Sequence, residues 1–176
     1  LDGRDIREAR ISDIRRHIAM VTQDVRLFHG TVRDNLTFFD HSIPDRRLLD
    51  VIDDLGLADW YDNLPDGLAT QLQPEGGGLS AGEAQLLAFT RVFLRDPGVV
   101  ILDEASSRLD PSTEQHIEQA IDRLVEDRTV IMIAHRLGSV QRCDEIMIVE
   151  QGRIVEHGDR KQLAEAPESR FHRLLQ

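Results

Sequence analysis

Two hydrophobic patterns alternate along the chain: short continuous apolar runs, and stripes with helical spacing. Apolar runs of strand length lie at 17–22, 99–103 and 129–134, and the last two predict buried strands. Helical stripes lie at 45–55, 84–94 and 117–125, and the stripe at 84–94 is apolar nearly all round. Strands that alternate with helices predict an α/β fold, with a parallel sheet covered by helices on both faces.

Local signals add helix starts and a hairpin. Thr31 is a predicted cap for a short helix through Leu36, and Asp110 followed by Pro111 predicts a helix N-terminus. Strands at 145–149 and 153–156 flank a Gln-Gly turn and predict a hairpin, followed by two short helices at the end of the chain. The segment 31–97 is predicted to be helical only, and therefore to form a helical subdomain between core segments 1–30 and 98–176.

Composition and charge exclude several classes of function. The 176 residues hold 21 Lys+Arg and 32 Asp+Glu, a formal charge of −11, which argues against nucleic acid or anionic lipid as the main partner. The single cysteine, Cys143, cannot form an internal disulfide, which favours a reducing compartment. No apolar run approaches the ~18 residues of a membrane-spanning helix.

The strongest chemical signal is the acidic pair Asp103-Glu104, which directly follows a predicted buried strand. Ligands of open α/β sheets bind at the carboxyl ends of the strands. A first carboxylate there suits Mg²⁺, and a second can polarise a water for attack on a phosphoryl group. A solvated turn after a buried strand is the ordinary alternative.

A second signal is the segment Ser80-Ala81-Gly82-Glu83, which precedes the buried helix. It has the Ser-x-x-Glu pattern of a capping box, and a helix N-terminus is also suited to bind a phosphate. The two interpretations are compatible, because a capped helix still offers its other N–H groups.

Three single residues complete the candidate site. Gln23 and His135 each follow a predicted strand, and Asp110 lies on the turn after the acidic pair. Each also has an ordinary interpretation, as a surface amide, a structural histidine and a helix cap. A nucleotide site is favoured because these three residues occur in order along the chain with the acidic pair Asp103-Glu104 and the Ser80–Glu83 segment.

The ordered motifs resemble those of the nucleotide-binding domain of ATP-binding cassette (ABC) transporters, closest to the exporter type. The matching segments are Val21-Thr22-Gln23-Asp24 with 27–36 (Q-loop), 79–83 (signature), 101–110 (Walker B and D-loop), 133–137 (H-switch) and 152–158 (C-terminal hairpin). The resemblance implies a P-loop NTPase-like, three-layer α/β core with an inserted helical subdomain. It also implies ATP and Mg²⁺ as ligands.

The resemblance also implies residue roles. Asp103 would help hold Mg²⁺, Glu104 would be the general base, His135 would contact the γ-phosphate, and Gln23 would sense Mg²⁺ and the attacking water. The signature residues Ser80, Ala81, Gly82 and Glu83 would serve the nucleotide held by a second such domain, identical or different, paired head to tail. Asp110 would link the two sites. The region 28–35 would meet a membrane domain, which implies a location on the cytoplasmic side of the membrane.

The sequence departs from the family pattern in two places. It contains no Gly-x-x-x-x-Gly-Lys-Ser/Thr motif, and its only lysine is Lys161, so we expect a partial, N-terminally incomplete domain that is inactive alone. Glu83 stands where the family usually has Gln. The leading hypothesis is an exporter ATPase domain, and the alternative is a degenerate, non-hydrolytic module that completes a partner's ATP site. A DNA-repair ABC ATPase is disfavoured because no heptad array is present.

Overall fold

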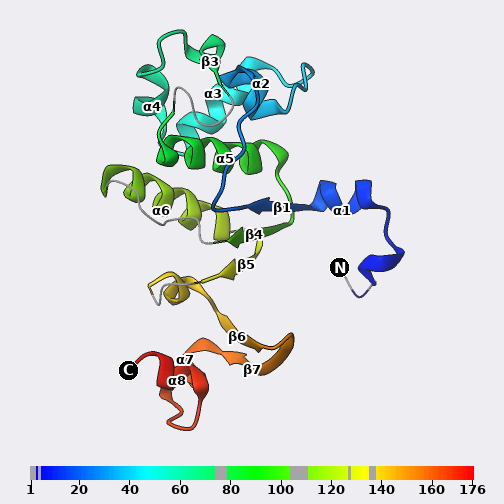
Figure 1. Ribbon diagram of the computed structural model, residues 1–176, viewed down its shortest axis with the longest axis vertical. Coiled ribbons are helices and arrows are strands. Elements are labelled where there is room, and N and C mark those ends of the chain that lie inside the picture. The colour runs from blue at the N-terminus through cyan, green and yellow to red at the C-terminus, as the bar shows by residue number, and fades with distance from the viewer. Residues whose placement is uncertain (1–2, 4, 74–78, 104–110, 127, 135–137) are drawn as a thin grey trace. The chain divides into compact units, whose positions relative to one another are not determined.

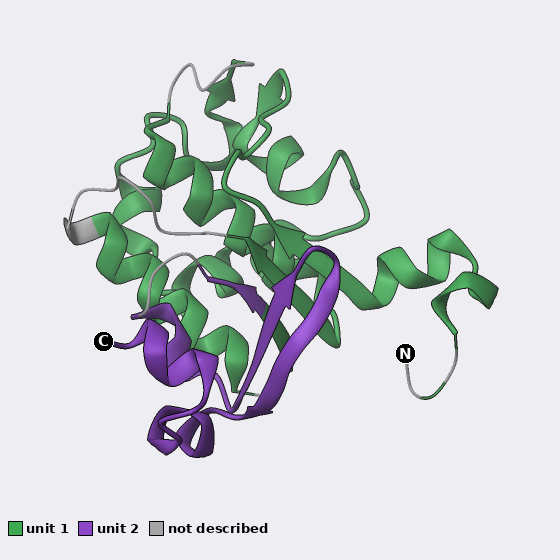
Figure 2. Ribbon diagram, turned by 60° about the horizontal axis from the view of Figure 1, so that its bottom comes forward, with its two compact units in different colours: residues 1–131 green, residues 132–176 purple. Residues whose placement is uncertain are grey.

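The computed structural model describes residues 1–176 except 1–2, 4, 74–78, 104–110, 127 and 135–137. The chain divides into two compact units, residues 1–131 and 132–176, coloured green and purple in Figure 2. Glu104, Asp110 and His135 lie outside the described residues. The predicted boundaries of the helical subdomain, at 30/31 and 97/98, stay a prediction.

A three-stranded sheet has the order β1 (Ile18–Val21), β4 (Val99–Asp103) and β5 (Thr129–Ile133) (Figure 1). β1 and β4 are parallel, and Val21 pairs with Leu102. Alternate side chains of a strand point to opposite faces. Ala19, Val21, Val100 and Leu102 are therefore on one face, and all four are buried. This confirms the α/β fold class and the parallel sheet.

The expected burial of the third strand is wrong. β5 forms over the predicted residues, but Ile131 is 53% exposed and Ile133 43% exposed. An apolar run predicts a strand from its own residues, whereas burial requires other elements to cover it. β5 has only β4 as a described neighbour in this sheet.

Helix α5 (Ala81–Arg95) is the most buried helix of the first unit. It packs against β1, α2 (Val32–Thr37), α3 (Asp45–Asp54) and α6 (Pro111–Val125). On α6 the predicted stripe is confirmed, because Ile117, Ala120, Ile121 and Leu124 are all buried. Because α5 contacts both the sheet and the neighbouring helices, its all-round apolar pattern is explained.

The segment predicted to be helical only also contains strand. β2 (Gly30–Thr31) pairs antiparallel with β3 (Gln71–Leu72), and Leu72 is fully buried. Two-residue strands are too short to show an alternating pattern, so this pairing could not be predicted from hydrophobic periodicity. Further short elements are η1 (Ile6–Glu8), α1 (Ile11–His17), α4 (Ala58–Asp62) and η2 (Gly67–Ala69).

The second unit contains the predicted hairpin. After η4 (Ser139–Arg142), β6 (Glu145–Glu150) pairs antiparallel with β7 (Arg153–Asp159). Gln151 and Gly152 have φ values of 49° and 74°, which suits the twist of a two-residue hairpin turn. Helices α7 (Arg160–Glu165) and α8 (Arg170–Leu174) follow, and the Glu156 carboxylate of β7 accepts hydrogen bonds from the N–H groups of Arg170 (3.0 Å) and Phe171 (2.8 Å).

Candidate functional site: a sheet edge and a helix N-terminus

Gln23 and Asp103 lie at the same edge of the sheet. Gln23 comes two residues after β1, and Asp103 is the last residue of β4. Because β1 and β4 are parallel and in register at Val21 and Leu102, their carboxyl ends lie next to each other. Gln23 is exposed and Asp103 is half-buried. The structure thus brings these two predicted site residues to one edge.

The N-terminus of α5 has the predicted capping box. The Ser80 Oγ accepts a hydrogen bond from the Glu83 N–H (3.2 Å), and the Glu83 carboxylate accepts one from the Ser80 N–H (2.7 Å). The Glu83 carboxylate is therefore directed back to the start of its own helix. The N–H groups of Ala81 and Gly82 belong to the first turn, where an α-helix has no internal acceptors, so they can bind an anion.

The direction of α5 places this N-terminus on the side of the sheet where the strands end. At the other end of the helix, the Arg95 side chain donates to the carbonyl of Arg15, just before β1. Since α5 packs against β1, its N-terminus points toward the carboxyl edge of the sheet. The helix is about 22 Å long and β1 about 13 Å, so Ser80 extends well beyond the strand. Gln23 with Asp103 and Ser80 with Glu83 therefore lie on the same side of the sheet.

The chemistry of the sheet edge fits Mg²⁺. Mg²⁺ keeps several waters and is commonly bound by one or two carboxylates plus substrate phosphates. The Asp103 carboxylate and the Gln23 amide oxygen are hard ligands of this kind. Among the residues that the structure describes, no three His, Cys, Asp or Glu side chains gather into a metal-binding cluster.

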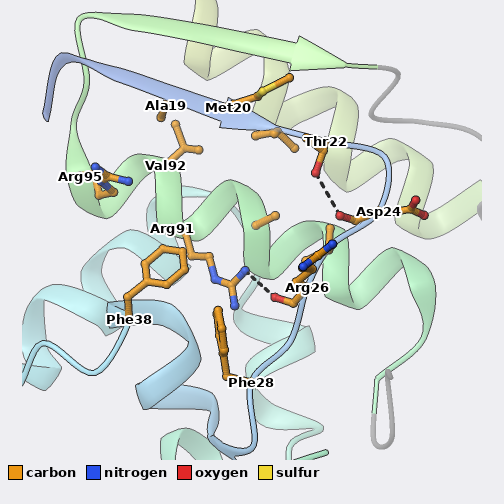
Figure 3. Close-up of a pocket in the computed structure, with 13 residues that line it drawn as sticks. Ala19, Met20, Thr22, Asp24, Arg26, Phe28, Phe38, Arg91, Val92 and Arg95 are labelled. Carbon is orange, nitrogen blue, oxygen red and sulfur yellow. Dashed lines mark hydrogen bonds between the residues drawn. The ribbon is translucent and has the colours of Figure 1, made fainter. Parts of the chain in front are cut away.

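A pocket of about 250 Å³ lies between β1, the segment after it, and α5 (Figure 3). Its lining includes Ala19 and Val92 from the packed strand and helix, and Phe28, Phe38 and Arg91 at its lower end. The Phe28 ring contacts the rings of Phe38 and Phe39 edge to face, with centroids 6.0 and 6.2 Å apart. All three rings are exposed, and we call them the aromatic cluster.

Arg91 lies beneath the aromatic cluster and is only 7% exposed. Its guanidinium donates to the carbonyls of Asn35 (2.8 Å) and Arg26 (3.1 Å) and to the Asn35 side-chain oxygen (3.2 Å). Its central carbon lies 4.7 Å from the Phe38 ring centroid. Burial lowers the pKa of Arg91 to about 10, so it stays protonated at neutral pH.

Asn35 completes this network and is fully buried. Its amide nitrogen donates to the carbonyls of Phe28 (2.9 Å) and Thr31 (3.0 Å), and its oxygen accepts from the Phe28 N–H (2.8 Å). Sequence reasoning missed Arg91, and it included Asn35 only as the last residue of the region 28–35. The available signal was a charged side chain, Arg91, inside an otherwise apolar helical stretch.

Known proteins resemble this chain in both sequence and structure. A family model described as ABC transporter matches residues 1–107. The ATP-dependent lipid A-core flippase of Pseudomonas fluorescens is 42% identical over 93% of this chain, which spans 27% of that protein. An ABC multidrug transporter of Trichophyton rubrum is 37% identical over 99% of this chain, which spans 13% of that transporter. The structure of a bacterial Atm1-family ABC exporter with ATP bound matches 99% of this chain with a TM-score of 0.86 and 30% identity, and the chain covers 30% of it.

The chain belongs to the ABC transporter family. The resemblance to the nucleotide-binding domain of the exporter type is confirmed, and so is the P-loop NTPase-like fold. The chain spans only about a quarter of the flippase that it matches. In the described part of the chain, every helix is too short or too polar to cross a bilayer.

Proposed function

We propose that this chain binds and hydrolyses ATP as the nucleotide-binding domain of a membrane exporter, on the cytoplasmic side of the membrane. The observation that carries the proposal is the shared edge of Gln23 and Asp103, with the α5 N-terminus directed to the same side. Family membership, and the ATP-bound exporter among the similar structures, support it.

Hydrolysis would be centred on the sheet edge. Asp103 with Gln23 would hold Mg²⁺, which neutralises phosphate charge when bound. Glu104, the next residue in the sequence, would accept a proton from the attacking water, and His135 would contact the γ-phosphate. Phosphoryl transfer depends mainly on positioning and charge neutralisation, and these residue types provide both.

The α5 N-terminus would serve a different nucleotide. Head-to-tail pairing with a second nucleotide-binding domain would let Ser80, Ala81 and Gly82 contact the partner's ATP. Asp110 would connect the two sites. The hydrogen bond from the Ser80 N–H engages the Glu83 carboxylate, which supports a helix-capping role rather than repulsion of the nucleotide.

The aromatic cluster would dock the membrane domain. Phe28, Phe38 and Phe39 follow the Q-loop segment and present exposed rings beside the pocket. Exposed apolar patches of this kind mark contact surfaces. An apolar helical segment of the transporter's membrane domain is the proposed occupant.

Mg-ATP calorimetry and an ATPase assay on the full-length gene product test the function. The 176 residues contain no P-loop motif, so the proposal assigns the main phosphate cradle to residues outside this sequence, and the 176-residue chain should bind Mg-ATP weakly. In the full-length protein, Glu104→Gln should retain ATP binding and lose at least about 100-fold in turnover, as expected for loss of a general base. Glu126→Gln, at the exposed turn directly after α6, is the matched control.

The outcomes separate the two functions. Unchanged turnover in Glu104→Gln would refute the assigned base. Binding without turnover in the wild-type protein would instead favour the non-hydrolytic module that completes a partner's site.

A further inference from the structure

We propose that Arg91 is a positioning residue that couples the aromatic cluster to the N-terminus of α5. This inference rests on the proposed function, in which the aromatic cluster binds the membrane domain and the α5 N-terminus binds ATP. The supporting observation is that one buried guanidinium on α5 contacts three residues of the segment after β1: Arg26 in the loop, and Asn35 and Phe38 at the end of α2.

The contacts form a rigid connection. The Asn35 carbonyl lies in the last turn of α2, where helix carbonyls have no internal donor, and Arg91 supplies one. Asn35 in turn holds both the N–H and the carbonyl of Phe28. A guanidinium offers several donors in a fixed planar fork, so it can hold these groups at once in one geometry. Displacing the cluster must therefore displace α5, or break these bonds.

The charge of Arg91 is not explained by an ion pair. Within the described part of the chain its polar contacts are two carbonyls and an amide oxygen, with aromatic faces beside them. Burying a charge is costly, and an apolar side chain of similar size would avoid that cost but would leave the two carbonyls and the amide oxygen without this donor. The fork geometry therefore accounts for an arginine at this position.

The backbone of two residues of the aromatic cluster is strained. Phe38 and Phe39 have φ values of 53° and 63°, in the left-handed region that bulky residues rarely adopt. Such strain clusters at contact and switch regions, where surrounding interactions maintain it. The Arg91 guanidinium against the face of the Phe38 ring is one of those interactions. Phe38 and Arg91 also line the same pocket.

Hydrogen–deuterium exchange of the full-length protein, with and without Mg-ATP, tests the coupling. In the wild type, Mg-ATP should slow exchange both at 79–90, which includes the α5 N-terminus, and at 28–39, which includes the aromatic cluster. In Arg91→Lys, which keeps the charge and loses the fork, and in Arg91→Met, the response at 79–90 should persist. The response at 28–39 should fall at least about fivefold, the lower range of site-to-site coupling.

Arg95→Met is the matched control. Arg95 lies one turn further along α5 and lines the same pocket, but it donates to Arg15 rather than to the cluster segment. In Arg95→Met, the Mg-ATP responses at 79–90 and at 28–39 should both stay within about twofold of the wild-type responses. A twofold change is smaller than the effect of a typical coupling between sites.

Each result is decisive. If Mg-ATP slows exchange at 28–39 in Arg91→Lys or Arg91→Met as much as in the wild type, the inference is overturned. Fast exchange at 28–39 without ATP in both variants would overturn it too, because Arg91 would then only maintain the local fold. If wild-type protein shows no Mg-ATP response at 79–90, the proposed function fails, independently of Arg91.

Discussion

Replacing Asn35 should destabilise the first unit strongly. Asn35 is fully buried and makes four hydrogen bonds, two to carbonyls and two from donors. Asn35→Ala removes the acceptor for the Phe28 N–H and for one Arg91 nitrogen. Both donors lie in part-buried or buried surroundings, where water replaces the lost acceptor poorly.

The expected magnitude follows from these two donors. A buried donor left without an acceptor costs about 1–3 kcal/mol, so two cost about 2–6 kcal/mol in unfolding free energy, and we expect about 3 kcal/mol because the Phe28 N–H is only part-buried. That is a large share of the 5–15 kcal/mol typical of a domain. Asn63→Ala is the matched control, since Asn63 is exposed and makes one side-chain hydrogen bond, to the Asp59 carbonyl (2.7 Å). Its cost should stay within about 0.5 kcal/mol.

Urea unfolding followed by tryptophan fluorescence measures both variants. Trp60 is the only tryptophan, and it is buried in α4 of the same unit, so its emission reports on this part of the chain. With a slope of about 2 kcal/mol per molar urea, Asn35→Ala should lower the midpoint by about 1.5 M at unchanged slope. Equal midpoints for Asn35→Ala and Asn63→Ala would refute the hydrogen-bond reasoning.

Two further predictions concern the α5 cap and the second unit. Glu83→Gln keeps an acceptor for the Ser80 N–H and should change stability by under about 0.5 kcal/mol, whereas Glu83→Ala should cost about 1 kcal/mol in urea unfolding; equal losses would contradict the capping box. Partial burial raises the pKa of Glu156, but hydrogen bonds from the Phe171 and Arg170 N–H groups and the Ser169 hydroxyl outweigh it and leave the pKa below its ordinary value. The stabilisation should therefore be complete above about pH 4.3, the unfolded value, and disappear as pH falls through the lower folded pKa. Amide exchange at Arg170 and Phe171, corrected for intrinsic rates, should show this dependence in wild type and lose it in Glu156→Gln; identical profiles would contradict it.

Local signals in the sequence determined most elements. β4 spans the predicted residues 99–103, α6 begins at the predicted Pro111, and both capping boxes, at Thr31 and Ser80, start helices. These features depend on neighbours a few residues apart, so the chain encodes them locally. The order of the motifs also identified the family, because motif spacing is a property of the sequence itself.

Only the tertiary structure determined how distant segments meet. The bond from Arg91 to Asn35 joins residues separated by 56 positions, and no periodicity relates them. The exposure of Ile131 likewise depends on which elements cover the sheet, and the β2–β3 pairing on where two short segments meet. The sequence determined which residue types carry the chemistry. Packing determined that Gln23 and Asp103 share one edge and that the α5 N-terminus is directed to the same side, because parallel pairing and helix direction are set by long-range contacts.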